Sequence, residues 1–245
     1  MLRRLDLRGP LQDVRSVLPR PVAAGEGPLE EVRAIVADVR QRGDVALRDM
    51  TARFDGAELE AIRVDPTEVA AAPDRVQPEV LAALEVAAEA VRRHHVGQVR
   101  PERRTEEDGL VIRSLSRPVE RVGCYAPGGR AAYPSTVLMT AVPAQVAGVD
   151  EVVLCVPPGV DGRIADVTLA AAAVAGVDAV YAVGGAQAVA AMAYGTETVP
   201  AVDVIVGPGN MYVALAKREV AGDVGVPSAF AGPSEVVVVA DASVP

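Results

Sequence analysis

After residue 123, short β-branched runs alternate along the chain with alanine-rich stretches that have helical spacing. The β-branched runs are residues 152–156, 179–183, 202–206 and 236–239. The helix-like stretches between them are residues 164–175, 186–194 and 211–220. Continuous apolar strands that alternate with helices predict a parallel sheet covered on both faces, which is a doubly wound α/β unit. Such sheets bind ligands at the carboxyl ends of their strands, so the loops that follow these strands are the first candidates for function.

The first 120 residues are more highly charged and are predicted to be mainly helical. Apolar residues recur at helical spacing from residue 29 to residue 39 and predict one helix. A second helix should carry Leu47 and Met50 and end at Gly56, and a longer one should run from Pro78 toward Gly97. From residue 109 to residue 122 the apolar runs are short and mixed with Arg and Ser, which favours strands.

Charge and aromatic content argue against one large class of partner. The 245 residues carry a formal net charge of −9, and only 3% of them are aromatic. A surface that binds nucleic acid needs a basic face, and single-strand binding needs aromatic side chains on which bases can stack. We therefore expect no nucleic-acid partner.

Cysteine content and the apolar stretches favour a cytoplasmic protein. Two cysteines, Cys124 and Cys155, are too few for a disulfide framework in a chain of this size, which favours a reducing compartment. The N-terminus lacks the apolar stretch of a secretory signal. Residues 131–149 and 179–196 lack charge, but proline, glycine and glutamine interrupt them. Each is therefore interpreted as a strand, a turn and a helix in series rather than as a membrane span.

Four loops that contain glycine are candidates for ligand binding: residues 127–129, 184–187, 207–210 and 231–235. Two of them lie where a strand passes into a helix, where glycine lets the backbone approach a ligand and free amides favour phosphate. Neither has the G-x-G-x-x-G spacing of the common dinucleotide fingerprint, so plain turns remain an alternative. Gln187 and Asn210 would place an amide side chain at the mouth of such a site, although either could equally cap a helix.

The sequence offers no obvious metal site or catalytic base. His94 and His95 are adjacent on a predicted helix, so their side chains diverge, and we expect them to be solvated residues at the helix end. A catalytic zinc needs about three protein ligands, and no cluster of histidine, cysteine and carboxylate residues has that spacing. Cys124 and Cys155 lie in apolar surroundings and are expected to be buried and unreactive. Glu235 could act as a base, but nothing in its context singles it out.

Several of these loops belong to longer motifs that resemble those of the histidinol dehydrogenases. The motifs are RPVERVGCYAPGG at 117–129, STVLM at 135–139, VGGAQA at 183–188, GTE at 195–197, GPGN at 207–210 and AGPSEV at 231–236. Their order and content match the family over residues 117–241, and the helical N-terminus fits more loosely.

The resemblance implies a zinc-dependent oxidoreductase of histidine biosynthesis. Such an enzyme oxidises L-histidinol through histidinal to L-histidine and uses two NAD molecules in succession. The resemblance implies that Tyr125, Gln187 and Asn210 contact NAD and that Ser234 contacts the substrate. It also implies a homodimer.

The resemblance further implies incomplete Rossmann-like units of the aldehyde-dehydrogenase kind, with one unit inserted in the other. Residues 1–120 would form the N-terminal helical part of the first α/β domain. Residues 121–232 would form the inserted NAD-binding domain, and residues 233–245 would contain a strand that returns to the first domain.

The family's metal-binding Gln and His, its other metal ligands and its proton-handling Glu–His pair follow the last residue of this chain. The resemblance therefore assigns no catalytic and no metal-binding residue here. Residues 226–230 also lack an acidic residue that many members carry. Residues 241–245 resemble the start of a helix after a strand, and a frayed tail is the alternative.

We therefore expect a shortened chain that is inactive alone. Two other functions stay open. One is a related dehydrogenase of another small alcohol, such as a sulfonated diol. The other is a non-catalytic module for NAD binding or assembly.

Overall fold

The computed structural model describes residues 28–129, 131–229 and 240–241. The chain divides into two units, Met1–Glu26 with Gly232–Pro245 and Gly27–Ala231, and all described residues except 240–241 belong to the second. The predicted strand at 236–239, the predicted substrate residue Ser234 and the possible base Glu235 lie outside the described residues. None of the helices in the described ranges is both long and apolar enough to cross a bilayer.

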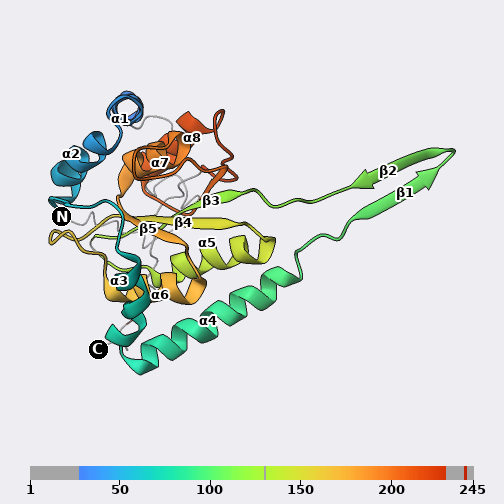
Figure 1. The fold of residues 1–245 in the computed structure, drawn as a ribbon, viewed down its shortest axis with the longest axis horizontal. Coiled ribbons are helices and arrows are strands. Elements are labelled where there is room, and N and C mark those ends of the chain that lie inside the picture. The colour runs from blue at the N-terminus through green and yellow to red at the C-terminus, as the bar shows by residue number, and fades with distance from the viewer. Residues whose placement is uncertain (1–27, 130, 230–239, 242–245) are drawn as a thin grey trace. The chain divides into compact units, whose positions relative to one another are not determined.

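A four-stranded parallel sheet lies at the centre of the second unit (Figure 1). Its strands are β3 (Arg121–Tyr125), β4 (Glu151–Val156), β5 (Ala179–Ala182) and β6 (Val204–Val206). They are arranged in the order β5-β4-β3-β6. Along the chain, β4 and β5 are added in turn on one side of β3, and β6 is then added on the other side of β3. This reversal creates a crevice at the carboxyl ends of β3 and β6, where doubly wound sheets bind ligands.

Helices cover both faces of this sheet (Figure 1), as the alternation in the sequence predicts. One face carries α1 (Leu29–Arg42), α2 (Asp44–Asp55), α7 (Gly185–Tyr194) and α8 (Met211–Val220). The other face carries α3 (Pro66–Ala71), a short 3-10 helix (Ala72–Arg75), α4 (Pro78–Val96), α5 (Pro134–Ala147) and α6 (Asp166–Ala175). Strand alternation divides the core accordingly, because Val153 and Cys155 face the first set while Val152 and Leu154 face the second. The predicted α/β fold class is confirmed.

Two local predictions need correction. The first is the interpretation of residues 131–149 as strand, turn and helix, because α5 occupies Pro134–Ala147 as one helix with Pro143 inside it. The buried packing of α5 against α4, α6 and the sheet outweighs the hydrogen bond that Pro143 cannot make. The second is the omission of β3 from the parallel sheet, in which it is a central strand.

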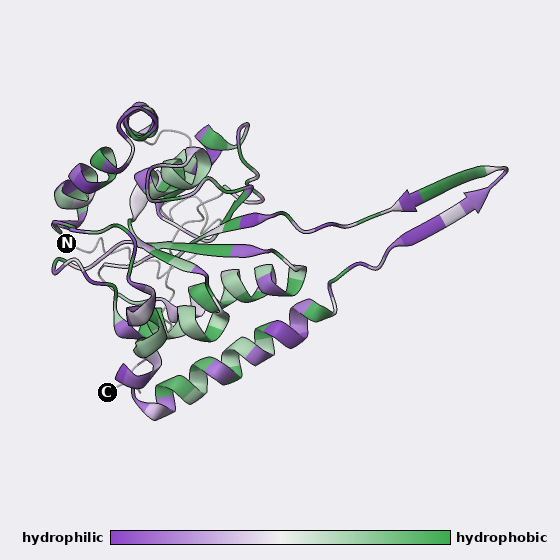
Figure 2. Cartoon of the chain, viewed as in Figure 1, coloured by the Kyte–Doolittle hydropathy of each residue, from purple (hydrophilic) through white to green (hydrophobic). Residues whose placement is uncertain are grey.

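Two further strands, β1 (Arg103–Glu107) and β2 (Leu110–Ser114), form an antiparallel hairpin. The sequence predicted strands over residues 109–122, which include β2, but it did not predict β1 or the hairpin. Its turn consists of Asp108 and Gly109, which both have positive φ, the backbone that a two-residue hairpin turn requires. Every residue of the two strands is exposed. Figure 2 shows the contrast between a polar β1 and an apolar β2.

Candidate functional site

A cavity of about 390 Å³ lies at the carboxyl edge of the sheet. The loops after β3, β5 and β6 line it, together with residues of α1 and α2. Tyr125, Gln187 and Asn210 all contribute to its wall. The structure therefore brings together three residues that the sequence analysis selected from three separate loops.

Tyr125 ends β3 and is buried at the base of this cavity. Its hydroxyl oxygen accepts a hydrogen bond from the backbone N–H of Gly185 at 3.1 Å, which ties the end of β3 to the start of α7. Burial raises the pKa of Tyr125 to about 12, so the phenol keeps its proton at neutral pH. Tyr125 can therefore donate a hydrogen bond to a ligand, but it cannot act as a base.

Gln187 lies in the first turn of α7 and is only 2% exposed. Its side-chain amide makes no hydrogen bond to any residue within the described ranges, although it lines the cavity. The turn before α7 packs closely on Pro157, because a Cβ on Gly184 would lie 2.4 Å from Cβ of Pro157. Glycine therefore lets this turn place the start of α7, and Gln187 with it, at the cavity. An amide that lines a cavity and has no partner among the described residues can both donate and accept there, so Gln187 is suited to hold a ligand.

Asn210 caps a helix. The sequence left two roles open for it, a helix cap and a ligand contact. It is the N-cap residue of α8, and its Oδ1 accepts a hydrogen bond from the N–H of Val213 at 3.2 Å. The residue is exposed and also lines the cavity. Capping thus fixes the side chain at the mouth, and it leaves the amide N–H groups available to a ligand.

The loop that carries Asn210 is fixed by a buried lysine. Lys217 of α8 is 4% exposed, and its Nζ donates hydrogen bonds to the carbonyl oxygens of Gly207 at 2.5 Å and Ser228 at 3.3 Å. Burial lowers the pKa of Lys217. Gly207 has φ of +107°, which only glycine adopts readily, so the loop requires glycine at this position.

The motif at 195–197 forms a polar cluster that we call the Asp44 latch, made of Asp44, Thr196, Glu197 and Thr198. Asp44 begins α2 and is buried. Thr196 donates to Asp44 at 2.6 Å, the N–H of Thr198 donates at 3.2 Å, and the Thr198 hydroxyl donates as well. In return, Glu197 accepts from the N–H of Asp44 at 2.8 Å. The latch fixes α2 against the loop after α7, so this motif is structural.

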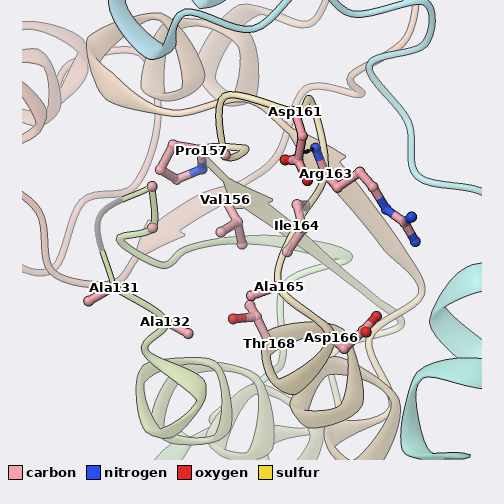
Figure 3. Close-up of a pocket in the computed structure, with 13 residues that line it drawn as sticks. Ala131, Ala132, Val156, Pro157, Asp161, Arg163, Ile164, Ala165, Asp166 and Thr168 are labelled. Atoms are coloured by element: carbon pink, nitrogen blue, oxygen red, sulfur yellow. Dashed lines mark hydrogen bonds between the residues drawn. The ribbon is translucent and has the colours of Figure 1, made fainter. Parts of the chain in front are cut away.

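A second cavity, of about 520 Å³, adjoins the first and shares Gly128 and Pro157 with it. Figure 3 shows its wall, formed by the segment between β3 and α5, by the loop after β4 and by the first turn of α6. The side chains of Arg163 and Asp166 point away from the cavity in this view. Gly128 and Gly129 of the candidate loop 127–129 line it, whereas Tyr125, Gln187 and Asn210 do not.

The remaining candidates stand apart from the first cavity. His94 and His95 lie in the last turn of α4, where Nδ1 of His95 is 2.8 Å from the carbonyl oxygen of Val91. Cys124 and Cys155 are buried on opposite faces of the sheet, as predicted. Burial raises the pKa of Cys124 to about 12 and raises the pKa of Cys155 as well, so neither is a ready nucleophile.

Sequence reasoning missed the contribution of the N-terminal helices to the first cavity. Glu31 of α1 and Asp55 of α2 both line it. Glu31 is held by Tyr212, whose hydroxyl donates to its Oε2 at 3.0 Å. One signal was available for Asp55: it directly precedes the glycine at the C-terminal end of a helix, where an acidic side chain is unfavourable.

Comparisons with known proteins agree with these observations. Residues 19–245 match the family model described as histidinol dehydrogenase. A histidinol dehydrogenase of Methanosarcina mazei is 48% identical over 240 residues, which are 95% of this chain and 55% of that protein. One of Burkholderia mallei is 48% identical over 250 residues, with coverage of 98% and 56%.

A solved structure agrees as well. The crystal structure of histidinol dehydrogenase from Elizabethkingia anophelis superimposes with a TM-score of 0.84 at 37% identity, over 92% of this chain and 52% of that chain. The chain thus spans about half the length of the relatives that it matches.

Proposed function

Since the chain belongs to the histidinol dehydrogenase family, we propose that it takes part in the NAD-dependent oxidation of L-histidinol through histidinal to L-histidine. The cavity that Tyr125, Gln187 and Asn210 line would be the dinucleotide site. The convergence of these three side chains at the carboxyl edge of a parallel sheet is the observation that supports this proposal.

The residues at the cavity suit a dinucleotide. Gln187 offers an amide that lines the cavity without a partner among the described residues, and Tyr125 offers a hydroxyl that stays protonated. The first turns of α7 and α8 start at the same edge, and the free backbone N–H groups of a helix start favour a pyrophosphate. Amide, hydroxyl and backbone groups together would orient the cofactor.

When bound, NAD would accept a hydride from the carbon that bears the alcohol. In the proposed complex, Tyr125 and Gln187 would hold the cofactor by hydrogen bonds, and Asn210 would fix its position at the mouth. Ser234, which lies outside the described residues, would contact the substrate.

Zinc binding belongs to the proposal only for the full-length family enzyme. In the described part of the chain no three His, Cys, Asp or Glu side chains gather as a metal site would require. In this proposal, the metal ligands and the proton-handling pair of the family correspond to positions after residue 245. We also propose a homodimer, a cytoplasmic location and an inserted NAD-binding domain at residues 121–232.

Gln187→Ala tests the proposed dinucleotide site directly. We expect the affinity for NAD to fall about tenfold or more, because loss of one well-placed hydrogen bond corresponds to about 1.4 kcal/mol. Isothermal titration calorimetry of the 245-residue chain measures this affinity, and circular dichroism checks that the variant folds. Gln98→Ala, at an exposed position after α4, is the matched control and should bind NAD like the unaltered chain. Equal affinity in both variants would contradict the proposed role of Gln187.

A second prediction concerns turnover. The 245-residue chain should produce no NADH from L-histidinol and NAD, because the resemblance places the proton-handling Glu–His pair outside it. The absorbance of NADH measures this, and the histidinol dehydrogenase of Methanosarcina mazei serves as the positive control. Steady NADH production by the purified chain would refute this expectation. Comparison of L-histidinol with a sulfonated diol in a full-length protein would then separate the two dehydrogenase functions.

A further inference from the structure

At the proposed dinucleotide cavity, Asp55 carries a buried polar atom without a partner in the described part of the chain. It is the last residue of α2 and lines the cavity wall. Its Oδ2 is buried and has no hydrogen-bond partner among the residues that the structure describes. Burial raises the pKa of Asp55 to about 6, so the carboxylate is ionised at neutral pH without any compensating group.

The position of Asp55 is unfavourable for a second reason. The C-terminal end of a helix carries a partial negative charge, which repels a carboxylate. α2 does not need the side chain in order to end, because Gly56 closes the helix in the left-handed conformation. The nearest basic residue in sequence, Arg53, stacks on the ring of Phe54 at 4.9 Å and forms no ion pair with Asp55. Buried polar groups left without partners in this way are expected chiefly at functional sites.

The rest of the cavity indicates which ligand group would satisfy this carboxylate. The described residues that line the cavity include Asp55 and Glu31 but no lysine or arginine. A wall of this kind accepts hydrogen bonds from hydroxyl groups and disfavours an additional phosphate through like-charge repulsion. In a dinucleotide, the groups that donate through hydroxyls are the riboses.

We propose that Asp55 recognises a ribose of the dinucleotide: its Oδ2 accepts a hydrogen bond from a ribose hydroxyl, and its charge, with that of Glu31, selects NAD against NADP. This assignment rests on the proposed function, since it takes the cavity to be the NAD site. It adds to that function the residue that distinguishes the two dinucleotides.

The experiment compares three variants of the 245-residue chain by calorimetry with NAD and NADP. Asp55→Ala removes the acceptor and should lower NAD affinity about tenfold. Asp55→Asn keeps a neutral acceptor, so NAD affinity should fall less while NADP affinity rises. Asp49→Asn makes the same chemical change at an exposed site on the same helix and should leave both affinities unchanged.

Two mononucleotides show which ribose is involved. Ligand-observed NMR with AMP and with nicotinamide mononucleotide reports on the adenosine half and the nicotinamide half separately. We expect Asp55→Ala to weaken the binding of one half and to leave the other unchanged. If both halves bind to Asp55→Ala as they do to the unaltered chain, the recognition of ribose by Asp55 is refuted.

Thermal stability supplies a second readout. A residue with only a structural role would change the melting temperature without changing the affinity for NAD. The titratable groups at the same cavity are Tyr125 from β3, Glu31 from α1 and Tyr212 from α8. Since the folded pKa of Asp55 lies above its unfolded value, this residue favours the folded state at low pH and loses that contribution as pH rises through about 6. Without NAD, Asp55→Asn should therefore melt higher than the unaltered chain at about pH 7.5 and alike at about pH 4.

The outcomes separate the two proposals. If the unaltered chain does not bind NAD, the proposed function fails and this inference fails with it. If the unaltered chain binds NAD but Asp55→Ala binds it equally well, only the inference is overturned. A higher melting temperature of Asp55→Asn with unchanged nucleotide affinities would likewise overturn it, because Asp55 would then destabilise the fold without binding the nucleotide.

Discussion

Gly207→Ala should prevent the formation of the native fold, or lower the free energy of unfolding by more than about 4 kcal/mol. A Cβ at this position would lie 2.0 Å from the carbonyl oxygen of Tyr125 and 2.9 Å from its carbonyl carbon. Rotation of a side chain cannot relieve this overlap, because both partners are backbone atoms. The positive φ of Gly207 adds strain to any other residue. The two loops that overlap are those that carry Tyr125 and Asn210, so the cavity would be lost as well.

Gly222→Ala is the matched control for this prediction. A Cβ on Gly222 would meet no atom within 4 Å, so we expect a change within about 0.5 kcal/mol. Chemical denaturation followed by circular dichroism measures both variants. A Gly207→Ala chain that unfolds at the same denaturant concentration as Gly222→Ala would show that the two loops do not approach as closely as described.

Asp44→Ala should lower the free energy of unfolding by about 3 kcal/mol, the largest loss expected from a single side chain outside the cavity. The substitution removes the acceptor for the hydroxyl groups of Thr196 and Thr198 and for one backbone N–H. These donors are part-buried and would lose their partner. Urea denaturation measures the difference, and Asp49→Ala, at an exposed ion pair, should stay within about 0.5 kcal/mol.

The effect of Asp44→Ala should also depend on pH. Burial opposes the ionisation of Asp44, but the hydrogen bonds from Thr196 and Thr198 outweigh it and lower the pKa of this carboxyl below its usual range. A lowered folded pKa stabilises the protein above the unfolded pKa, and this contribution is lost as pH falls through the folded pKa. The stability difference between the unaltered chain and Asp44→Ala should therefore shrink below about pH 4. A constant difference down to low pH would refute this explanation.

The alternating runs in the sequence predicted most of the sheet and its helices. Each of these strands that the structure describes is buried on both faces and therefore forms a continuous apolar run that can be recognised from local sequence alone. β3 lacks that signal, since Gly123 and Cys124 interrupt its apolar run, and its place between β4 and β6 became visible only in the structure. The single helix α5 was missed because its burial outweighs Pro143, and burial depends on distant segments.

The candidate site was predictable in part for a similar reason. Gln187 and Asn210 stand directly after glycine loops that join strands to helices, so local sequence singled them out. Asp55 and Glu31 lie on helices more than 60 residues before Tyr125, and nothing local connects them with the sheet. Only the packing of α1 and α2 against α7 and α8 brings these carboxylates to the cavity.

The Asp44 latch joins parts of the chain that a ribosome makes at very different times. Asp44 and Glu197 are separated by 153 positions, so α2 leaves the ribosome long before the loop that holds its first residue exists. The same helix carries Asp55 at its other end, about 16 Å away at 1.5 Å per residue. Translation must therefore pass residue 198 before α2 can be fixed, and residue 212 before the wall of the cavity is complete. During most of its synthesis this chain therefore has part of its sheet but not the complete cavity wall.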